Sequence, residues 1–314
     1  MKEIMALGEV LIDMTQSGTD ELGNGQFTAY PGGAPANVAV AISRLGGSAG
    51  FIGKVGDDAF GRGLAETLKK EDVDVAGLYI CNDIPTTMAL VSVDETGDRD
   101  FAFYRTPGAD TQLTTEEALS ALKGEPAPKI LHVGSLSMTN EPSKSACEEA
   151  VKYAKENGML VSYDPNYRAA LWDSEERAIE MMKVLLPYSD ILKVSDEEMP
   201  MLTGTQDFCE GSRILCEAGP ALVLVTLGPD GVYVRCKDET DSLPGVDVDV
   251  ADTNGAGDTF LGAMLCQIAA KGCRPEEIDF KELIVMADYA NRAAALTCSR
   301  HGAIPAMPYA SELK

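Results

Sequence analysis

The chain has 314 residues, 45% of them hydrophobic, which fits one large globular α/β domain and excludes a disordered or fibrous protein. Its formal net charge of −24, with no Lys/Arg cluster, argues against nucleic acid or an anionic membrane surface as partner. Eight cysteines without a C-x-x-C pair and only two histidines indicate reduced thiols rather than disulfides or a zinc finger. Because the acidic N-terminal run does not resemble a signal peptide and no apolar segment is long enough to span a membrane, we expect a cytoplasmic protein.

The first third of the chain begins with a short strand-like run and continues with two segments that break the alternation of strands and helices. These segments span about residues 14–33 and 76–107, and both contain extended runs of alternating polarity. The runs at 88–93 and 99–105 are separated by a turn-forming stretch at 94–98, which is typical of an antiparallel hairpin. We therefore expect a small sheet outside the main one.

A Gly-rich turn at Pro31–Asn37 leads into a helix whose apolar stripe is Val38, Ile42 and Leu45. Glycines in such a turn let the backbone approach a ligand closely. This is the first of two Gly-rich turns that open helices.

The middle of the chain predicts a parallel sheet. Short apolar runs recur about every thirty residues, with helical patterns between them, which is one β–α unit repeated. Since ligands bind beyond the carboxyl ends of such strands, the polar and Gly-rich residues that follow each run mark the expected site. The strands are expected at Lys129–Val133, Met159–Tyr163, Asp190–Val194 and Ala221–Thr226, with helices at Pro142–Glu156 and Ser174–Leu186.

The second Gly-rich turn, at 252–260, opens a helix whose apolar positions recur at helical spacing from Phe260 onward. It places Asp258 in the first helical turn, where the positive helix end is expected to keep the carboxylate ionised. Successive N–H groups of this turn can converge on an anion. Taken alone, the stretch is equally consistent with a turn that binds nothing.

Together the two turns resemble the two signature segments of the ribokinase-like (PfkB-type) carbohydrate kinases, the first at the sugar and the second at the phosphates. The resemblance runs from Gly8 to about Pro308. Within the family, the stretches 164–168 and 193–198 are most similar to the fructokinase branch. The resemblance implies a single ribokinase-like α/β domain over residues 1–314: a three-layer sandwich with a mostly parallel central sheet, in which the small sheet is a lid over the sugar.

The same resemblance implies an ATP-dependent sugar kinase that transfers the γ-phosphoryl group to a primary hydroxyl of a ketose, with fructose as the expected substrate. A 2-keto-3-deoxygluconate kinase, or another sugar or nucleoside kinase of the family, is the alternative. A nicotinamide-dependent oxidoreductase is disfavoured because no G-x-G-x-x-G follows the first strand. A sugar-binding regulator without catalysis would be expected to lack the base or the glycines of the second turn, which are intact.

Phosphoryl transfer needs a base, stabilisation of phosphate charge and alignment of the two substrates. Asp258 is the expected base, and the N–H groups of Gly255, Ala256 and Gly257 are expected to receive the charge. Each of four candidate residues has an alternative role: a turn at a strand end for Asp13, a helix cap for Asn37, and a surface salt bridge for Arg105 and for Arg168. The positions that the family resemblance assigns to the sugar are Asp13, Gly32, Gly33, Asn37, Arg105, Arg168 and Asp258.

The resemblance also assigns nucleotide and cation positions. Many members have an Asn where this chain has Ser195, and Lys193 is expected to supply the missing phosphate contact. ATP and magnesium are the implied cofactors, potassium is implied by the cation loop, and several members dimerise through the lid. The nucleotide positions are Lys193, Ser195, Glu198, Thr226, Gly228, Gly231, Gly257 and Asn291, and the potassium positions are Asp252, Asn254, Thr297, Arg300 and Gly302.

Overall fold

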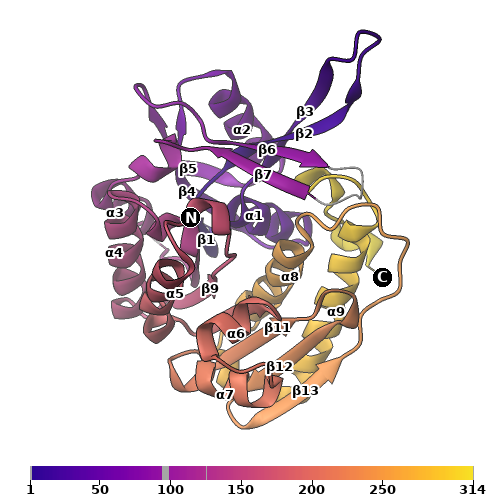
Figure 1. Cartoon of the computed structure of the whole chain (residues 1–314). Coiled ribbons are helices and arrows are strands. Elements are labelled where there is room, and N and C mark those ends of the chain that lie inside the picture. The colour runs from indigo at the N-terminus through magenta and orange to yellow at the C-terminus, as the bar shows by residue number, and fades with distance from the viewer. Residues whose placement is uncertain (1, 94–98, 125, 314) are drawn as a thin grey trace.

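The computed structural model describes residues 2–93, 99–124 and 126–313, and its central feature is a nine-stranded sheet (Figure 1). The strands are β1 (Ile4–Leu7), β4 (Ala49–Gly56), β5 (Asp74–Cys81), β8 (Ile130–Gly134), β9 (Leu160–Asp164), β10 (Ile191–Ser195), β11 (Leu222–Thr226), β12 (Val232–Cys236) and β13 (Glu239–Leu243). Their order is β13-β12-β11-β10-β9-β8-β1-β4-β5. All neighbouring strands from β11 to β5 run parallel, whereas β12 and β13 add an antiparallel hairpin at one edge.

Helices cover both faces of this sheet and so give three layers. The strand side chains alternate between two apolar cores: Leu222 and Leu224 lie in one, Val223 and Val225 in the other, and all four are fully buried. The first face is covered by α1 (Ala34–Arg44), α2 (Ala59–Lys70), α8 (Ala256–Lys271) and α9 (Phe280–Cys298). The second is covered by α3 (Thr115–Leu122), α4 (Ser143–Glu156), α5 (Glu175–Val184), α6 (Glu198–Thr203) and α7 (Phe208–Glu217). The expected three-layer α/β sandwich is confirmed.

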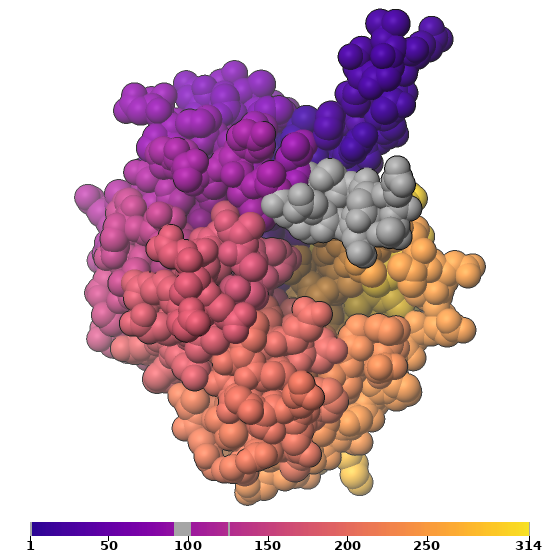
Figure 2. Space-filling view, in the orientation of Figure 1, coloured from indigo at the N-terminus to yellow at the C-terminus, as the bar shows by residue number. Residues whose placement is uncertain are grey.

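A second, four-stranded sheet lies beyond the main one, with the strand order β3-β2-β6-β7. Its strands are β2 (Leu11–Thr19), β3 (Gly25–Gly32), β6 (Met88–Val93) and β7 (Arg99–Tyr104). The expected β6–β7 pairing is antiparallel, as predicted, and the turn predicted at 94–98 lies outside the described residues. The β2–β3 hairpin, coloured indigo, stands out from the body of the molecule (Figures 1 and 2).

One part of the expected small sheet belongs elsewhere. Residues 76–81, assigned from the sequence to the lid, form most of β5, which pairs in parallel with β4 at the edge of the main sheet. An edge strand is incompletely buried: within β5 only Gly77 is buried and the other residues are intermediate or exposed, so the segment resembles a partly exposed lid strand.

The elements predicted between 129 and 226 agree with the structure to within two residues at each end. Apolar five-residue runs bounded by polar turns give a strong local signal for buried parallel strands. In the described part of the chain, no helix is long and apolar enough to cross a membrane.

Candidate active site

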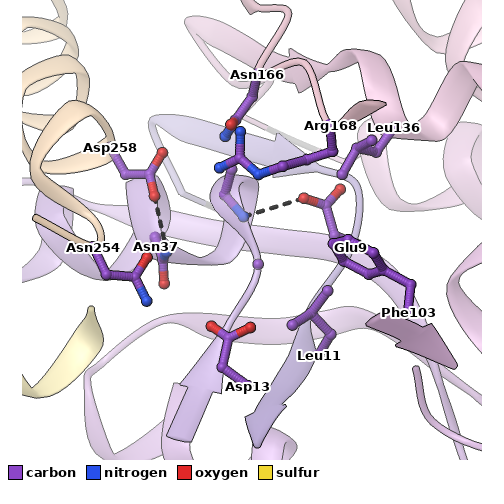
Figure 3. A pocket seen from close by; sticks show the side chains of 12 residues that line it. Glu9, Leu11, Asp13, Asn37, Phe103, Leu136, Asn166, Arg168, Asn254 and Asp258 are labelled. Carbon is purple, nitrogen blue, oxygen red and sulfur yellow. Dashed lines mark hydrogen bonds between the residues drawn. The ribbon is translucent and has the colours of Figure 1, made fainter. Parts of the chain in front are cut away.

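A pocket lies where the carboxyl end of β1 meets the small sheet and the start of α1 (Figure 3). Segments that are distant in sequence converge on it, including β2, β7, the loop after β9 and the turn before α8. This is the place where open α/β sheets bind ligands. Its walls are formed by Glu9, Leu11, Asp13, Gly33, Ala34, Asn37, Phe103, Leu136, Asn166, Arg168, Asn254 and Asp258.

The second Gly-rich turn begins α8 as predicted. Gly255 has φ 78°, and a Cβ atom there would lie 3.1 Å from the Ala303 Cα atom, so both conformation and space require glycine. The Ala256 N–H donates to the Thr253 carbonyl at 3.3 Å, which occupies one of the three donors expected to bind charge. The first-turn N–H groups of Gly257 and Asp258 have no carbonyl one turn earlier within the helix, so they are the better anion donors.

Asp258 lies at the pocket wall with only 8% of its surface exposed. Burial, with the nearby negative charge of Asp164, raises the pKa of Asp258 to about 6, although the hydrogen bond from Asn37 opposes the shift. The expectation that the helix end alone sets its ionisation is therefore too simple, because desolvation outweighs the favourable helix field. At neutral pH the carboxylate remains mostly ionised, with a pKa closer to the working pH of a base.

Asn37 reaches Asp258 from α1. Its Nδ2 atom donates a 2.8 Å hydrogen bond to Asp258 Oδ2, and both side chains are buried. The N-cap of α1 is Gly33, with no side-chain cap bond, so Asn37 is not the helix cap that was the alternative. The Asn37 Oδ1 atom has no hydrogen-bond partner among the described residues.

The sugar-site prediction for Asp13, Gly32 and Gly33 brings these three residues together. Asp13 is the third residue of β2 and pairs with Tyr30, so the strand-end alternative is wrong. A Cβ atom on Gly32 would collide with the Asp13 carboxylate. Gly33 has φ 104°, and a Cβ there would lie 2.6 Å from the Glu9 carbonyl oxygen.

The two arginines assigned to the sugar, Arg105 and Arg168, lie in different environments in the structure. Arg168 lines the pocket, is exposed, and donates to the Tyr167 carbonyl at 2.9 Å. Arg105 is 7% exposed and is not among the residues that line the pocket. Its guanidinium pairs with Asp110 and donates to the Thr139 hydroxyl (2.7 Å) and the Leu136 carbonyl (2.9 Å). The resemblance assigns Arg105 to the sugar, whereas in this structure a buried carboxylate five residues later holds its guanidinium and the residue does not line the pocket.

Glu9 and Asn166 line the pocket but were not assigned from the sequence. Each follows the end of a strand, β1 and β9 respectively, which is the signal that could have identified them. Glu9 Oε1 accepts the Ala34 N–H at 3.1 Å, and burial raises the pKa of Glu9 to about 7. Asn166 has φ 48°, a left-handed conformation that Asn tolerates better than most residues.

The residues predicted at the phosphates form a buried polar cluster beside the turn. Lys193 Nζ lies 3.1 Å from Asp164 Oδ2, and a Cβ on Gly257 would lie 3.1 Å from the same Nζ atom. Glu198 accepts the Tyr167 N–H (2.6 Å) and the Ser195 N–H (2.8 Å), one with each oxygen. Lys193 is thus held against the turn that opens α8, whereas Glu198 is engaged in fixing two loops.

The remaining nucleotide positions lie apart from the pocket. Thr226 ends β11, and Gly228 and Gly231 flank the short turn that follows it. A Cβ on Gly231 would collide with the Leu243 carbonyl oxygen, so only glycine fits there. Asn291, on α9, donates to the Pro244 carbonyl at 3.3 Å, which ties this helix to the segment after β13.

The expected cation loop is assembled around Asp252. Its two oxygens accept the Asn254 N–H (2.8 Å) and the Gly302 N–H (3.0 Å), which joins two segments. Thr297 is fully buried and donates to the Ala293 carbonyl at 3.2 Å, and the Arg300 N–H donates to the Thr297 carbonyl at 3.1 Å. Within the described ranges, no group of three or more His, Cys, Asp or Glu side chains is placed to hold a metal ion.

Comparison with known proteins agrees with this arrangement. A family profile described as pfkB family carbohydrate kinase matches residues 1–310. Probable fructokinase-2 of Arabidopsis thaliana is 42% identical over 309 residues, covering 97% of this chain and 92% of the relative. Two solved structures are each 32% identical to this chain; each alignment covers 100% of this chain and 97% of the solved chain. A fructokinase from Xylella fastidiosa with bound ATP gives a TM-score of 0.90, and a double-mutant fructokinase from Vibrio cholerae O395 with fructose, ADP and potassium ion bound gives 0.87.

The profile covers nearly the whole chain, and both Gly-rich turns open helices, as the sequence predicted. The chain belongs to the pfkB family of carbohydrate kinases.

Proposed function

We propose that the protein is an ATP-dependent fructokinase of the cytoplasm, which transfers the γ-phosphoryl group of ATP to a primary hydroxyl of fructose. The observation that carries this proposal is the buried Asp258 carboxylate, placed at the start of α8 and facing a pocket lined by carboxylate and amide side chains. Such groups suit the paired hydroxyls of a sugar. The high identity to named fructokinases over nearly the full chain supports fructose as the sugar.

The base step follows from the Asp258 geometry. The carboxylate accepts the hydroxyl proton while the sugar oxygen forms its bond to the γ-phosphorus. The bond from that phosphorus to the bridging oxygen breaks, and its electron pair leaves with ADP. Asn37 holds Oδ2 at 2.8 Å, which fixes the orientation of the carboxylate before the sugar binds.

The charge on the transferred group is received at the start of α8. The N–H groups of Gly257 and Asp258 supply oriented donors, and Lys193 adds a positive charge next to them. Asp164 keeps the ammonium in place through their 3.1 Å contact. Since these groups are buried and fixed, little reorganisation accompanies the reaction.

Magnesium fits this site as an ion carried mainly by the ATP phosphates, because it usually binds through one or two carboxylates plus phosphates and water. When bound, it neutralises phosphate charge during transfer. Potassium is assigned to the loop around Asp252, where the Asp252 carboxylate bridges Asn254 and Gly302 beside the pocket. Oxygen-rich loops of this kind suit a hard cation.

We also assign the small sheet a role in forming a homodimer. The β2–β3 hairpin projects from the body and exposes Leu22 (88%) and Phe27 (42%), two apolar side chains that a partner subunit would cover (Figure 2). Sedimentation of the purified protein as a 33.4 kDa species at micromolar concentration would contradict this assignment.

The decisive experiment measures ADP release with ATP and magnesium across fructose, 2-keto-3-deoxygluconate, ribose, adenosine, glucose and tagatose. We expect fructose to give the highest kcat/KM. A higher value for the sugar acid would replace fructose by the alternative substrate while retaining the kinase, and ADP release with none of the six would overturn the proposed activity.

A further inference from the structure

Glu9 and Asn37 are the pocket residues that each have a buried side-chain oxygen without a hydrogen-bond partner among the described residues, and Glu9 is the acid of the two. The side chain lines the pocket, yet the residue is only 4% exposed. Oε1 accepts the Ala34 N–H, whereas Oε2 has no hydrogen-bond partner within the described residues. A carboxylate can accept about four hydrogen bonds, and leaving that capacity unused in a buried position is costly. Figure 3 shows Glu9 across the pocket from Asp258, with Arg168 above and Phe103 beside it.

The surrounding charges do not satisfy Glu9. Arg105 lies close enough to influence its pKa, but the guanidinium is bonded to Asp110, Thr139 and the Leu136 carbonyl. Asp110 is itself a negative charge that adds to the cost. The protein thus maintains a desolvated, under-bonded acid at the wall of its substrate pocket, and such groups concentrate at functional sites.

The net charge of the residues that line the pocket also favours a ligand with hydroxyl donors over an acidic ligand. Three of its lining residues are carboxylic acids, Glu9, Asp13 and Asp258, and a single lining residue, Arg168, is basic. A sugar with a carboxylate would enter a field dominated by like charge, which disfavours it. A neutral sugar instead brings O–H donors, for which carboxylates are acceptors.

We propose that the Glu9 carboxylate accepts a hydroxyl of the sugar and, by its charge, selects neutral sugars over sugar acids. The inference rests on the proposed sugar-kinase function and adds a substrate-binding residue to it. The Ala34 bond shows that Glu9 also holds the start of α1, so a useful test must separate hydroxyl binding from support of that turn.

Glu9→Gln makes this separation. The Gln carbonyl can still accept the Ala34 N–H, while its amide nitrogen removes the charge and one acceptor. At pH 8, where the wild-type carboxyl is ionised, we expect KM for fructose to rise about 10–100-fold, as loss of a hydrogen bond to a charged group predicts. Turnover at saturating fructose should change less than about 3-fold, because Asp258 and the α8 turn are intact.

The matched control is Glu117→Gln, which alters a partly buried carboxylate on α3 that pairs with Lys54 at 2.7 Å and does not line the pocket. Its KM for fructose should match that of the wild type. The fructose-to-2-keto-3-deoxygluconate ratio of kcat/KM should fall at least about 10-fold in Glu9→Gln and stay constant in Glu117→Gln.

A set of fructose analogues, each lacking one hydroxyl, identifies the contact. One analogue should bind the wild type weakly and lose little or nothing further in Glu9→Gln, because the missing hydroxyl and the missing acceptor belong to one bond. Binding is measured by calorimetry with the sugar alone, so the result does not depend on turnover. Circular dichroism checks that the variant is folded.

The outcomes separate cleanly. If the wild type does not phosphorylate fructose, the proposed function fails. If the wild type phosphorylates fructose while Glu9→Gln keeps KM and the selectivity ratio within about 2-fold, the Glu9 inference alone is overturned. Equal additional loss for every analogue in the variant would make Glu9 a support of the α1 turn rather than a sugar ligand, and would also overturn it.

Discussion

Asn37 and Asp258 lie 221 positions apart in the chain and are joined by a 2.8 Å hydrogen bond from the Asn37 amide to the Asp258 carboxylate. The bond connects the two Gly-rich turns, because Asn37 lies in the first turns of α1 and Asp258 in the first turn of α8. The two Gly-rich turns are therefore fixed relative to each other by the proposed base itself.

Removing this bond should change the pH profile. Burial and Asp164 raise the pKa of Asp258 to about 6, and the Asn37 hydrogen bond opposes them. In Asn37→Ala the opposing contribution is lost, so the acid limb of kcat/KM against pH, expected near pH 6 in the wild type, should move to higher pH. Alanine is compatible with the helix, so α1 should persist. An unmoved acid limb would show that Asn37 does not control the base.

Asp258→Asn should fold and still bind ATP and sugar, but turnover should fall on the order of 10²–10⁴-fold, as loss of a positioned base predicts. The amide keeps the shape and cannot accept the proton. Rates are measured at saturating ATP and fructose, with binding checked by calorimetry. Retention of more than about a tenth of the wild-type kcat would reduce this turn to a phosphate-binding element.

Gly257→Val should lower kcat more than it weakens ATP binding. The added Cβ would lie 3.1 Å from Lys193 Nζ, so the ammonium must move away from the transferred phosphoryl group. Gly63→Val is the matched control, since a Cβ on that helical glycine of α2 meets nothing within 4 Å. Steady-state rates and ATP titrations compare the two variants. Equal kcat values in Gly257→Val and Gly63→Val would show that Gly257 and Lys193 do not stabilise the charge of the transferred group.

The two arginines should behave differently. Arg105→Met leaves Asp110 buried without its partner, so we expect a loss of about 3–5 kcal/mol in the free energy of unfolding. Arg168→Met should leave stability nearly unchanged and raise KM for substrate, because this side chain is exposed at the pocket. Urea unfolding and fructose kinetics distinguish the pair. A stable Arg105→Met with a raised KM would restore Arg105 to the sugar site.

The sequence was sufficient for the elements whose signals are local. The run at 221–225 is apolar and the segment lies between two turn-forming Gly-Pro pairs, at 219–220 and 228–229; the strand predicted at 221–226 forms β11 with a one-residue difference. β5 was misassigned because a short extended run does not show which strand lies alongside it. Its parallel partner β4 is set by packing of the whole sheet.

The position of a site residue could be predicted from the sequence where a motif fixes the backbone. It was much harder to predict where tertiary packing sets the direction or burial of the side chain. Asp258 follows from the glycines before it, which permit the turn that opens α8. Arg105 directly follows the lid strand β7, yet its direction depends on Asp110, which lies in a short 3-10 helix (Ala109–Gln112) that carries no recognisable motif. Glu9 is one of many acids in the chain, and only the fold buries it.

Glu9 and Asp258 should also make the protein less stable at alkaline pH. Burial raises the pKa of Glu9 from 4.5 to about 7 and that of Asp258 from 3.8 to about 6, so the folded state binds both protons more tightly than the unfolded state. Stability from these groups is fully present below the unfolded pKa values of 4.5 and 3.8 and is lost progressively as pH rises from there through the folded pKa values of about 7 and about 6. Above pH 8 each ionised group costs on the order of 3 kcal/mol.

Glu9→Gln should therefore raise the free energy of unfolding at pH 8.5 and raise it less at pH 5.5, which stays above the sequence pI of about 4.4. Asp258→Asn should raise it at both pH values, because the unfolded pKa of 3.8 means that most of the cost of ionised Asp258 is already present at pH 5.5. Glu117→Gln is the control of opposite sign. Burial favours the neutral form of Glu117, but the bonds from Lys54 and Thr114 outweigh it and hold the pKa of Glu117 below its usual value, so this variant should lose stability. Urea unfolding at the two pH values measures all three. If neither pocket variant gains stability at pH 8.5, the ionised carboxylates do not destabilise the folded protein as their burial indicates. The idea that the protein loses stability by keeping charged groups in its pocket would then be wrong.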